Sequence, residues 1–303
     1  MKMAALGPLC AFGSSVTWAL SSARYSRLSE NYSPPSINFT RAMIGLPLFI
    51  LSSFVIAGGW DLGLLSFQSV QISHLGWLGL SMVSTYGLGD AFFMLSTRSL
   101  GIPGALAIAS SFPIWTLLAG YFFGGEPISK VQIVGLFTSV LGVVTVVLNA
   151  PNSDQASSER RISATGVFLA LLSSLAWAIN TIAVSRGGEG VLPPVANTFR
   201  MIFALLVTAV LNPWMTPRSS LLLPKAEWLR WYWLFALDAF AGSYLYMYGL
   251  SHSPLAIGST LSSLAPVLSV PISLLLGTEK FSLYRTLGVG SVVIGIWLLV
   301  GSF

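Results

Sequence analysis

Long apolar stretches separated by short polar connections run along the whole chain. Each stretch has about 20 residues, which is enough to cross a bilayer as a helix. The stretches fall at 3–24, 36–57, 75–97, 102–124, 129–149, 163–184, 193–213, 228–250, 254–277 and 281–302. This pattern predicts an all-α membrane protein with ten transmembrane helices. Because most connections are short, helices that follow one another in sequence should be antiparallel neighbours.

The pattern of polar positions occurs twice. When Trp18 is laid on Trp177, the register holds without a gap for about two helices. The matched pairs in this register include Asn38 with Asn197 and Arg41 with Arg200. A weak internal repeat in a hydrophobic chain indicates two related bundles with a site between them.

We therefore divide the chain into a first five-helix repeat at 1–150, a polar linker at 151–162 and a second five-helix repeat at 163–303. Five is an odd number, so the second repeat enters the membrane from the opposite side. The repeats are then inverted, with a pseudo-two-fold axis in the membrane plane. Basic residues gather in the loops after odd-numbered helices, which by the positive-inside rule places both termini outside.

Composition agrees with a membrane protein and excludes several other classes. Hydrophobic residues make up 54% of the chain and charged residues only 8%, whereas soluble domains carry about 25% charged residues. The net charge of +5 is spread over short loops, with no basic stripe for nucleic acid. Cys10 is the single cysteine, so an intrachain disulfide is impossible.

No cofactor, metal or nucleotide site is predicted. The two histidines, His74 and His252, lie near span ends, and neither stands at metal-ligand spacing from Cys, Asp or Glu. The chain has no P-loop, which argues against ATP hydrolysis.

Two acidic residues lie inside predicted spans. Asp238 is near the middle of the span at 228–250, where a carboxylate costs a few kcal/mol unless it is paired, hydrated or protonated. It is either a proton- or cation-responsive group facing a central cavity or a structural hydrogen-bonding group. Asp90 lies nearer the end of its span, where an acid also reaches interfacial water, so both interpretations stay open.

Arg41 and Arg200 stand at matched places about a turn and a half into their helices. Asn38 and Asn197 lie one turn earlier on the same faces. A cavity-facing Arg can hold a carboxylate or phosphate through a bidentate pair, and a snorkelling Arg instead fixes the depth of its helix. Because they occur in both repeats, we assign these four residues to a gate or frame.

The expected site combines aromatic and small polar residues near the membrane midplane. Trp18 and Trp177 lie near the centres of the first helix of each repeat and form either an aromatic wall or packing contacts. Pro113 and Pro266 remove a backbone donor and loosen the helix one turn earlier. The predicted substrate-binding residues are Trp18, Trp177, Tyr86, Tyr244, Ser110, Ser263 and Asp238, with Asp90 as a further coupling residue.

Other repeated residues are predicted to be structural. Glu126 and Glu279 each follow a proline by thirteen residues and lie at helix ends, where acids cap the following helix. Two glycine pairs repeat every seven residues on one helix face, which suits close helix packing or a dimer contact: Gly135 with Gly142 and Gly288 with Gly295. The chain is therefore expected to be a monomer or a homodimer.

The doubled order of these residues resembles the EamA family of the drug/metabolite transporter superfamily. The last part of each repeat carries it: Pro113…Gly125-Glu126…Gly135…Gly142, then Pro266…Gly277-Thr278-Glu279…Gly288…Gly295. The resemblance implies a ten-helix secondary transporter of a small metabolite, amino acid or drug, often an exporter. Family members usually have both termini in the cytoplasm. This orientation is opposite to the one that the distribution of basic residues predicts, so the side of the membrane on which the termini lie stays open.

Two other classes compete with transport. Gly87-Leu88-Gly89-Asp90 resembles a signature of aspartyl intramembrane proteases, with Asp238 as the second acid of a dyad. Those enzymes also carry a Tyr-Asp helix and a Pro-Ala-Leu element, which this chain lacks. A non-transporting scaffold gives no reason for two inverted copies with polar midplane residues.

The sequence therefore predicts a non-enzymatic secondary active exporter that works by alternating access. The protein is predicted to be a multi-pass protein of the cell membrane, in particular of a bacterial inner membrane. Its expected partners are a small-molecule substrate and the lipid bilayer, with proton exchange through Asp238.

Overall fold

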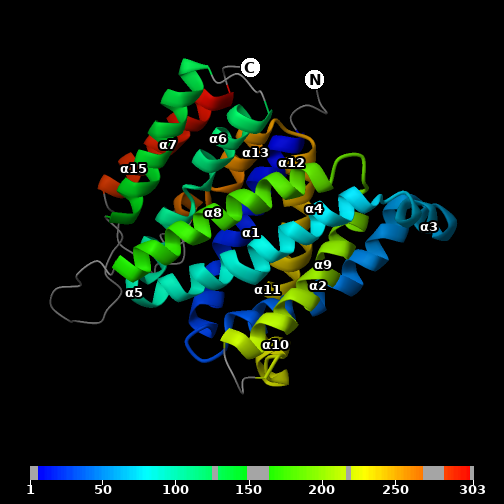
Figure 1. The fold of residues 1–303 in the computed structure, drawn as a ribbon. Coiled ribbons are helices and arrows are strands. Elements are labelled where there is room, and N and C mark those ends of the chain that lie inside the picture. Colours follow the sequence, from blue (N-terminus) through cyan, green and yellow to red (C-terminus); the bar gives the residue numbers. More distant parts are fainter. Residues whose placement is uncertain (1–5, 125–128, 149–163, 216–219, 269–282, 301–303) are drawn as a thin grey trace.

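The computed structural model describes residues 6–124, 129–148, 164–215, 220–268 and 283–300 (Figure 1). Regular structure in these ranges is helical. The first repeat contains α1 (Leu6–Leu28), α2 (Pro34–Ala57), α3 (Trp60–Gln68), α4 (Ile72–Met82), the π-helix η1 (Val83–Gly89), α5 (Asp90–Ala109), α6 (Phe112–Gly124) and α7 (Lys130–Leu148). The second contains α8 (Ala164–Gly187), α9 (Pro193–Met215), α10 (Lys225–Arg230), α11 (Tyr232–Ala236), the π-helix η2 (Leu237–Gly242), α12 (Ser243–Ser251), α13 (Leu255–Ser262) and α15 (Leu283–Val300).

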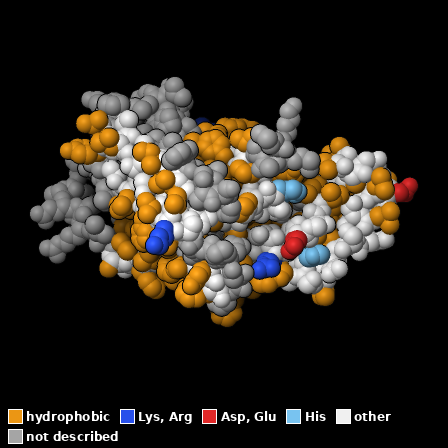
Figure 2. All heavy atoms as spheres, turned by 90° about the horizontal axis from the view of Figure 1, so that it is seen from above, with side chains coloured by type: hydrophobic (Ala, Val, Ile, Leu, Met, Phe, Trp, Pro, Cys, Tyr) orange, Lys and Arg blue, Asp and Glu red, His pale blue; other side chains and the backbone are white. Residues whose placement is uncertain are grey.

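The helices have the length and surface of an integral membrane protein. Within the described ranges, four helices are long and apolar enough to cross a bilayer, namely Pro34–Ala57, Ile72–Leu100, Ala164–Gly187 and Pro193–Met215. Large apolar side chains are exposed on their outer faces, including Leu51, Val55, Phe168, Leu206 and Val210. The face drawn in Figure 2 carries broad hydrophobic areas and few charged side chains. Such a surface is stable only against lipid.

α1 is the polar helix at the centre of the bundle. Its small hydroxyl side chains are buried and donate hydrogen bonds to carbonyls of the same helix, as Ser14 does to Ala11 (2.7 Å), Thr17 to Ser14 (2.8 Å) and Ser21 to Thr17 (2.6 Å). A hydroxyl satisfied in this way can be buried without a partner from another helix. Small residues also allow close approach of neighbouring helices, and α1 packs against α12 and α13 of the other repeat.

The two repeats interlock through matched pairs of helices. The second helix of each repeat packs on its counterpart, α2 on α9, and the last helices pack together, α7 on α15. The first helix of each repeat lies against the third predicted span of the other: α1 packs on α12, and α8 on α4 and α5. In Figure 1 the pair α7 and α15 lies at one end of the bundle and the pair α2 and α9 at the other. These contacts between the repeats place the first and third spans of both repeats around the centre of the bundle.

The seven-residue glycine spacing packs the two last helices within one chain. A Cβ at Gly142 would lie 2.6 Å from the carbonyl oxygen of Gly288, and a Cβ at Gly295 would lie 2.6 Å from that of Gly135. The backbones of α7 and α15 therefore touch at these positions. Close helix packing explains the spacing, and the alternative of a dimer contact on this face is wrong because the face is already covered by the chain itself.

The predicted fourth and ninth spans are interrupted just before their prolines. α5 continues without a break through the connection expected near 98–101 and ends at Ala109, and α6 begins at Phe112. In the second repeat α13 ends at Ser262, and the backbone is helical again over 265–268. Pro113 and Pro266 thus stand at the starts of new helical segments, where a missing N–H costs nothing. Glu126 and Glu279 lie outside the described residues.

Gly249 marks the closest approach of α12 to α1. A Cβ at this position would lie 2.6 Å from the backbone nitrogen of Ala11 and 2.8 Å from its Cα. We expect Gly249→Ala to lower the free energy of unfolding by about 1–3 kcal/mol, because the two backbones must separate. Thermal unfolding in detergent measures the loss. Gly76→Ala is the matched control, since a Cβ at Gly76 meets nothing within 4 Å, and an unchanged melting temperature for Gly249→Ala would contradict the packing.

Candidate functional site

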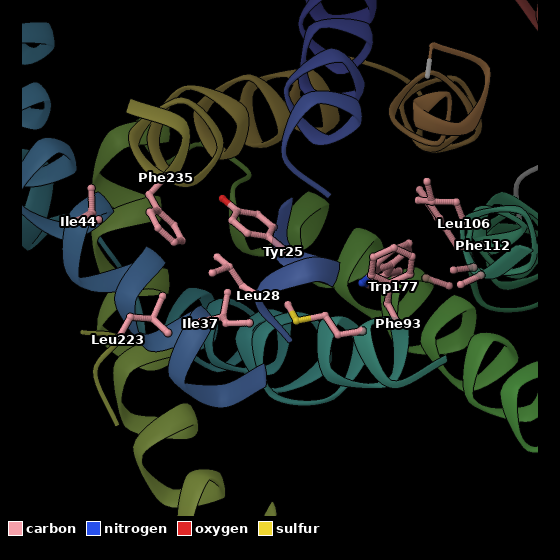
Figure 3. Close-up of a cluster of buried hydrophobic side chains, with 14 residues drawn as sticks. Tyr25, Leu28, Ile37, Ile44, Phe93, Leu106, Phe112, Trp177, Leu223 and Phe235 are labelled. Carbon is pink, nitrogen blue, oxygen red and sulfur yellow. The ribbon is translucent and has the colours of Figure 1, made fainter. Parts of the chain in front are cut away.

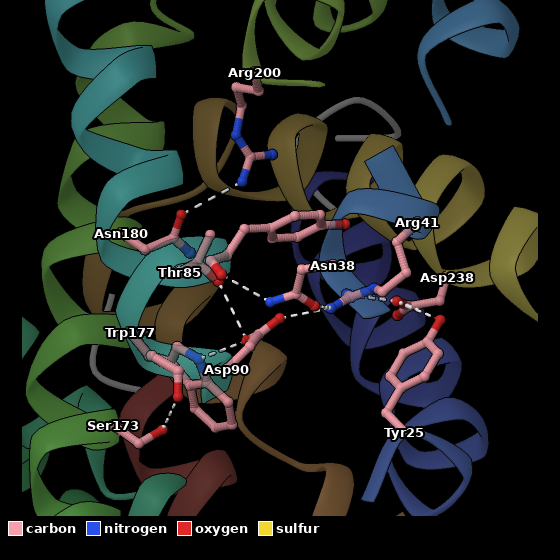
Figure 4. A network of polar contacts seen from close by, with 12 residues as sticks. Tyr25, Asn38, Arg41, Thr85, Asp90, Ser173, Trp177, Asn180, Arg200 and Asp238 are labelled. Atoms are coloured by element: carbon pink, nitrogen blue, oxygen red, sulfur yellow. Dashed lines mark hydrogen bonds and ion pairs between the residues drawn. The ribbon is translucent and has the colours of Figure 1, made fainter. Parts of the chain in front are cut away.

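Arg41 lies at the centre of the molecule and binds two carboxylates. Ser33 caps α2 by accepting a hydrogen bond from the Ser36 N–H, and two prolines start the helix, so Arg41 follows two turns later. Its guanidinium lies 2.6 Å from Asp90 Oδ2 and 2.7 Å from Asp238 Oδ2. Figure 4 shows the two carboxylates on either side of the guanidinium. The three side chains are only 4–6% exposed, so this Arg41–Asp90–Asp238 triad is a buried ionic cluster.

Neighbouring groups supply further hydrogen bonds to the triad, although the buried Nε of Arg41 has no partner among the described residues. Arg41 also donates to Asn38 Oδ1 (2.7 Å). The Tyr25 hydroxyl donates to Asp238 Oδ2 (3.1 Å), and the Trp177 indole N–H donates to Asp90 Oδ1 (3.0 Å). Buried charges are stable only when such bonds replace lost hydration. The triad joins the repeats, because Asp238 and Trp177 belong to the second and the others to the first.

Backbone carbonyls in η1 and directly after η2 accept hydrogen bonds from the buried asparagines. Asn38 Nδ2 donates to the Tyr86 carbonyl in η1 (2.8 Å), and Asn197 Nδ2 donates to the Ser243 carbonyl directly after η2 (3.2 Å). A π-helical segment offsets the i→i−4 bonding of an α-helix and is common at functional sites. Each asparagine then accepts a hydrogen bond from the arginine of its own helix through its Oδ1. The matched Asn–Arg pairs of the sequence are therefore one structural frame used twice.

Arg200, the counterpart of Arg41, has neutral partners. It donates to Ser81 Oγ (3.0 Å), Asn197 Oδ1 (2.8 Å) and Asn180 Oδ1 (3.3 Å). Its residue is 3% exposed, and the ion pairs formed by the described residues do not include it. Figure 4 shows Arg200 apart from the triad, reaching Asn180.

Aromatic rings enclose the triad. Trp18 and Trp177 meet edge to face with centroids 5.7 Å apart. The Arg41 guanidinium lies 4.4 Å from the Tyr86 ring centroid and 4.6 Å from that of Tyr25, within cation–π range. Tyr25 and Trp177 also belong to the apolar cluster drawn in Figure 3. That cluster excludes water from one side of the charges.

A cavity of about 120 Å³ lies beside the triad and is lined by both repeats. The first repeat contributes Ser14, Thr17, Trp18, Arg41, Thr85, Tyr86, Asp90, Ser110 and Phe112. The second contributes Trp177, Asn180, Arg200, Asp238, Gly242, Ser243, Tyr246, Ser262, Ser263 and Ala265. The lining therefore mixes two cations and two anions with hydroxyl, amide and aromatic groups.

The structure brings most of the residues singled out in the sequence to this cavity. Those that line it are Trp18, Trp177, Tyr86, Ser110, Ser263, Asp90, Asp238, Arg41 and Arg200. Asn38 and Asn197 do not line it but hold the arginines. The arginines do not snorkel, because their side chains are buried at the centre of the bundle.

Tyr244 does not line the cavity. It stacks on Tyr248, with ring centroids 6.4 Å apart, and packs beside a separate apolar cluster. Tyr246 lies four residues after Gly242, on the helix face that lines the cavity, whereas Tyr244 lies two residues after Gly242 and faces away. The Tyr246 hydroxyl contacts Thr181 (2.7 Å) and accepts a hydrogen bond from Asn180 (3.1 Å).

The arrangement does not suit an aspartyl protease. A catalytic aspartate dyad shares one proton because two carboxylates approach each other directly. Here each carboxylate bonds a different nitrogen of the Arg41 guanidinium, which stabilises both as anions. The alternative function for Asp90 and Asp238 therefore has no support in the geometry.

Comparison with known proteins points to one family. The model of the EamA-like transporter family matches residues 5–148 and, a second time, residues 164–301. Among solved structures, one crystal structure of a protein is 19% identical and superposes with a TM-score of 0.72, covering 96% of this chain and 94% of its own. At that identity the likeness concerns the fold alone. No curated protein sequence matches this chain.

Proposed function

Since the chain belongs to the EamA-like transporter family in its two-repeat form, we propose that it is a secondary active transporter of a small polar or amphipathic solute. The observation that carries the proposal is the cavity between the repeats, whose polar lining comes from both. A solute site at the interface of two repeats is reachable from either side when the repeats rock against each other. The proposed frame is ten membrane spans in two inverted units, 1–150 and 163–303, joined by the linker at 151–162.

Contacts across the interface suggest how access is controlled. Arg24 at the end of α1 pairs with Glu227 of α10 (3.2 Å) and lies 4.2 Å from the Trp231 ring centroid. These residues belong to different repeats and adjoin the apolar cluster around Tyr25. We propose that they close one mouth of the cavity and that the Arg41–Asp238 pair rearranges when it opens. Export from a bacterial cell through its inner membrane is the proposed direction and location.

A labelling experiment tests alternating access. Cys10 is the only native cysteine, so Ser263→Cys in a Cys10→Ala background places one thiol at the cavity. We expect a membrane-impermeant maleimide to label it in vesicles of either orientation, because each mouth opens in turn. Ser69→Cys, on the exposed end of α3, is the matched control and should react from one side only. A cavity thiol that reacts from neither side, in folded protein, would favour the scaffold alternative.

A further inference from the structure

The two buried arginines occupy equivalent frames but differ in charge compensation. Asn38 holds Arg41 and donates to the Tyr86 carbonyl, as Asn197 holds Arg200 and donates to the Ser243 carbonyl. Asp238 stands five residues before Ser243, and Ser81 stands five residues before Tyr86. Arg41 bonds Asp238, and Arg200 bonds Ser81. Ser81 is therefore the counterpart of Asp238, without its charge.

The second acid is missing as well. Asp90 follows Tyr86 by four residues, and the residue four after Ser243 is Met247, which is fully buried. In the described part of the chain, Arg200 thus keeps the hydrogen-bonding frame of Arg41 and lacks both carboxylates. The Arg41–Asp90–Asp238 triad keeps one net negative charge, which balances Arg200 at longer range in the same cavity. No described carboxylate pairs with Arg200 directly, so a direct partner for this cation can come from a bound solute.

A guanidinium carries five N–H donors, and each arginine uses three of them. The buried Nε of Arg41 has no partner among the described residues, so spare donors do not distinguish the two arginines. What distinguishes Arg200 is that its three partners are all neutral. A second, independent feature lies in the same cavity. The Tyr86 hydroxyl is buried, with its residue 4% exposed, and no described residue forms a hydrogen bond with it. Two guanidinium N–H groups and a phenol O–H are donors that match an oxyanion.

We infer that Arg200 binds an oxyanion of the transported solute, a carboxylate or a phosphate, and thereby selects solutes that carry one. This inference rests on the proposed function, because it names the chemistry of the solute that the cavity holds. Arg41, whose charge is already compensated by two carboxylates, is the structural member of the arginine pair. Arg200 is the recognition member.

Thermal unfolding of the purified, detergent-solubilised protein tests the inference through binding. The probes are sodium acetate and sodium phosphate, each compared with sodium chloride at equal ionic strength. We expect at least one probe to raise the melting temperature of the wild type by several degrees, because a ligand of the folded state stabilises it. A preference for acetate assigns a carboxylate solute, and a preference for phosphate assigns a phosphorylated one.

Two variants provide the comparison. Arg200→Gln removes the cation, and Ser81→Asp supplies the missing carboxylate while keeping the arginine, so Ser81→Asp decides the test if Arg200→Gln does not fold. Both should abolish the anion-dependent rise. The inference is overturned if the wild type shows no rise or if Ser81→Asp retains a full one. If the protein transports a solute but shows no anion effect that depends on Arg200, the inference about Arg200 is overturned and the proposed function stands. If the anion effect is present but no solute is transported, the proposed function is overturned and the anion site stands.

Discussion

Replacing Arg41 by methionine is expected to lower the free energy of unfolding by about 3–5 kcal/mol, because two buried carboxylates then face each other without a counter-charge. Asp90 and Asp238 both bond this guanidinium at 2.6–2.7 Å. Transport should be lost together with stability, since the triad forms part of the cavity wall. Thermal unfolding in detergent and the yield of monodisperse protein measure the first effect.

Two comparisons separate the charge effect from simple loss of a side chain. Adding Asp90→Asn and Asp238→Asn to Arg41→Met should restore much of the stability, because neutral amides do not repel each other. Arg27→Met, at an exposed position of α1, should change stability by less than about 1 kcal/mol, as exposed charges usually do. If the Arg41→Met protein melts like the wild type, the carboxylates do not depend on this arginine.

Replacing Asp238 by asparagine is expected to reduce solute flux at least tenfold while the protein stays folded. The change preserves shape, and Arg41 keeps its bonds to Asp90 and Asn38. It removes the charged contact between Arg41 and Asp238, which joins the repeats at the cavity, so the balance between the two open states shifts. A metabolite-wide comparison of medium from cells producing the wild type or the variant identifies the solute, and proteoliposomes then measure its flux.

The same variant tests the proposed proton exchange. Wild-type flux should respond to an imposed pH gradient, whereas Asp238→Asn flux should be indifferent to it. Asp61→Asn is the matched control, because Asp61 is exposed on α3 and distant from the cavity. Wild-type flux that ignores the gradient removes proton coupling from the proposal, and an Asp238→Asn protein with normal flux removes Asp238 from the transport cycle.

The repeat and its matched residues were accessible from sequence because hydropathy and spacing are local properties. The pairing of Arg41 with Asp238 was not, since these residues lie far apart in the chain and meet only after α2 and η2 pack together. The sequence interpretation treated the arginines and the aspartates separately, and it assigned the arginines to a gate or frame. The contacts add that one arginine pairs with both acids.

Helix periodicity contains a signal for the tyrosine that reaches the cavity. Tyr246 lies eight residues after Asp238, close to the same face of a helix, whereas Tyr244 lies six residues after it, on another face. The sequence interpretation chose Tyr244 without applying this spacing. Asn180 had a visible signal, because it lies three residues after Trp177 on one face of α8. Its bond to Arg200 needed the packed structure.

The bulge at η1 has a consequence for how this chain tolerates change. One residue of an α-helix corresponds to about 100° of rotation. In a regular α-helix the loss of one residue therefore turns everything downstream around the axis. A π-turn holds one residue more than an α-turn, so deleting a single residue between Val83 and Gly89 would return the segment to a regular helix and leave Asp90 on nearly the same face. A deletion here is therefore tolerated better than a deletion within α2 or α8, and the surplus residue marks the place where the chain can shorten.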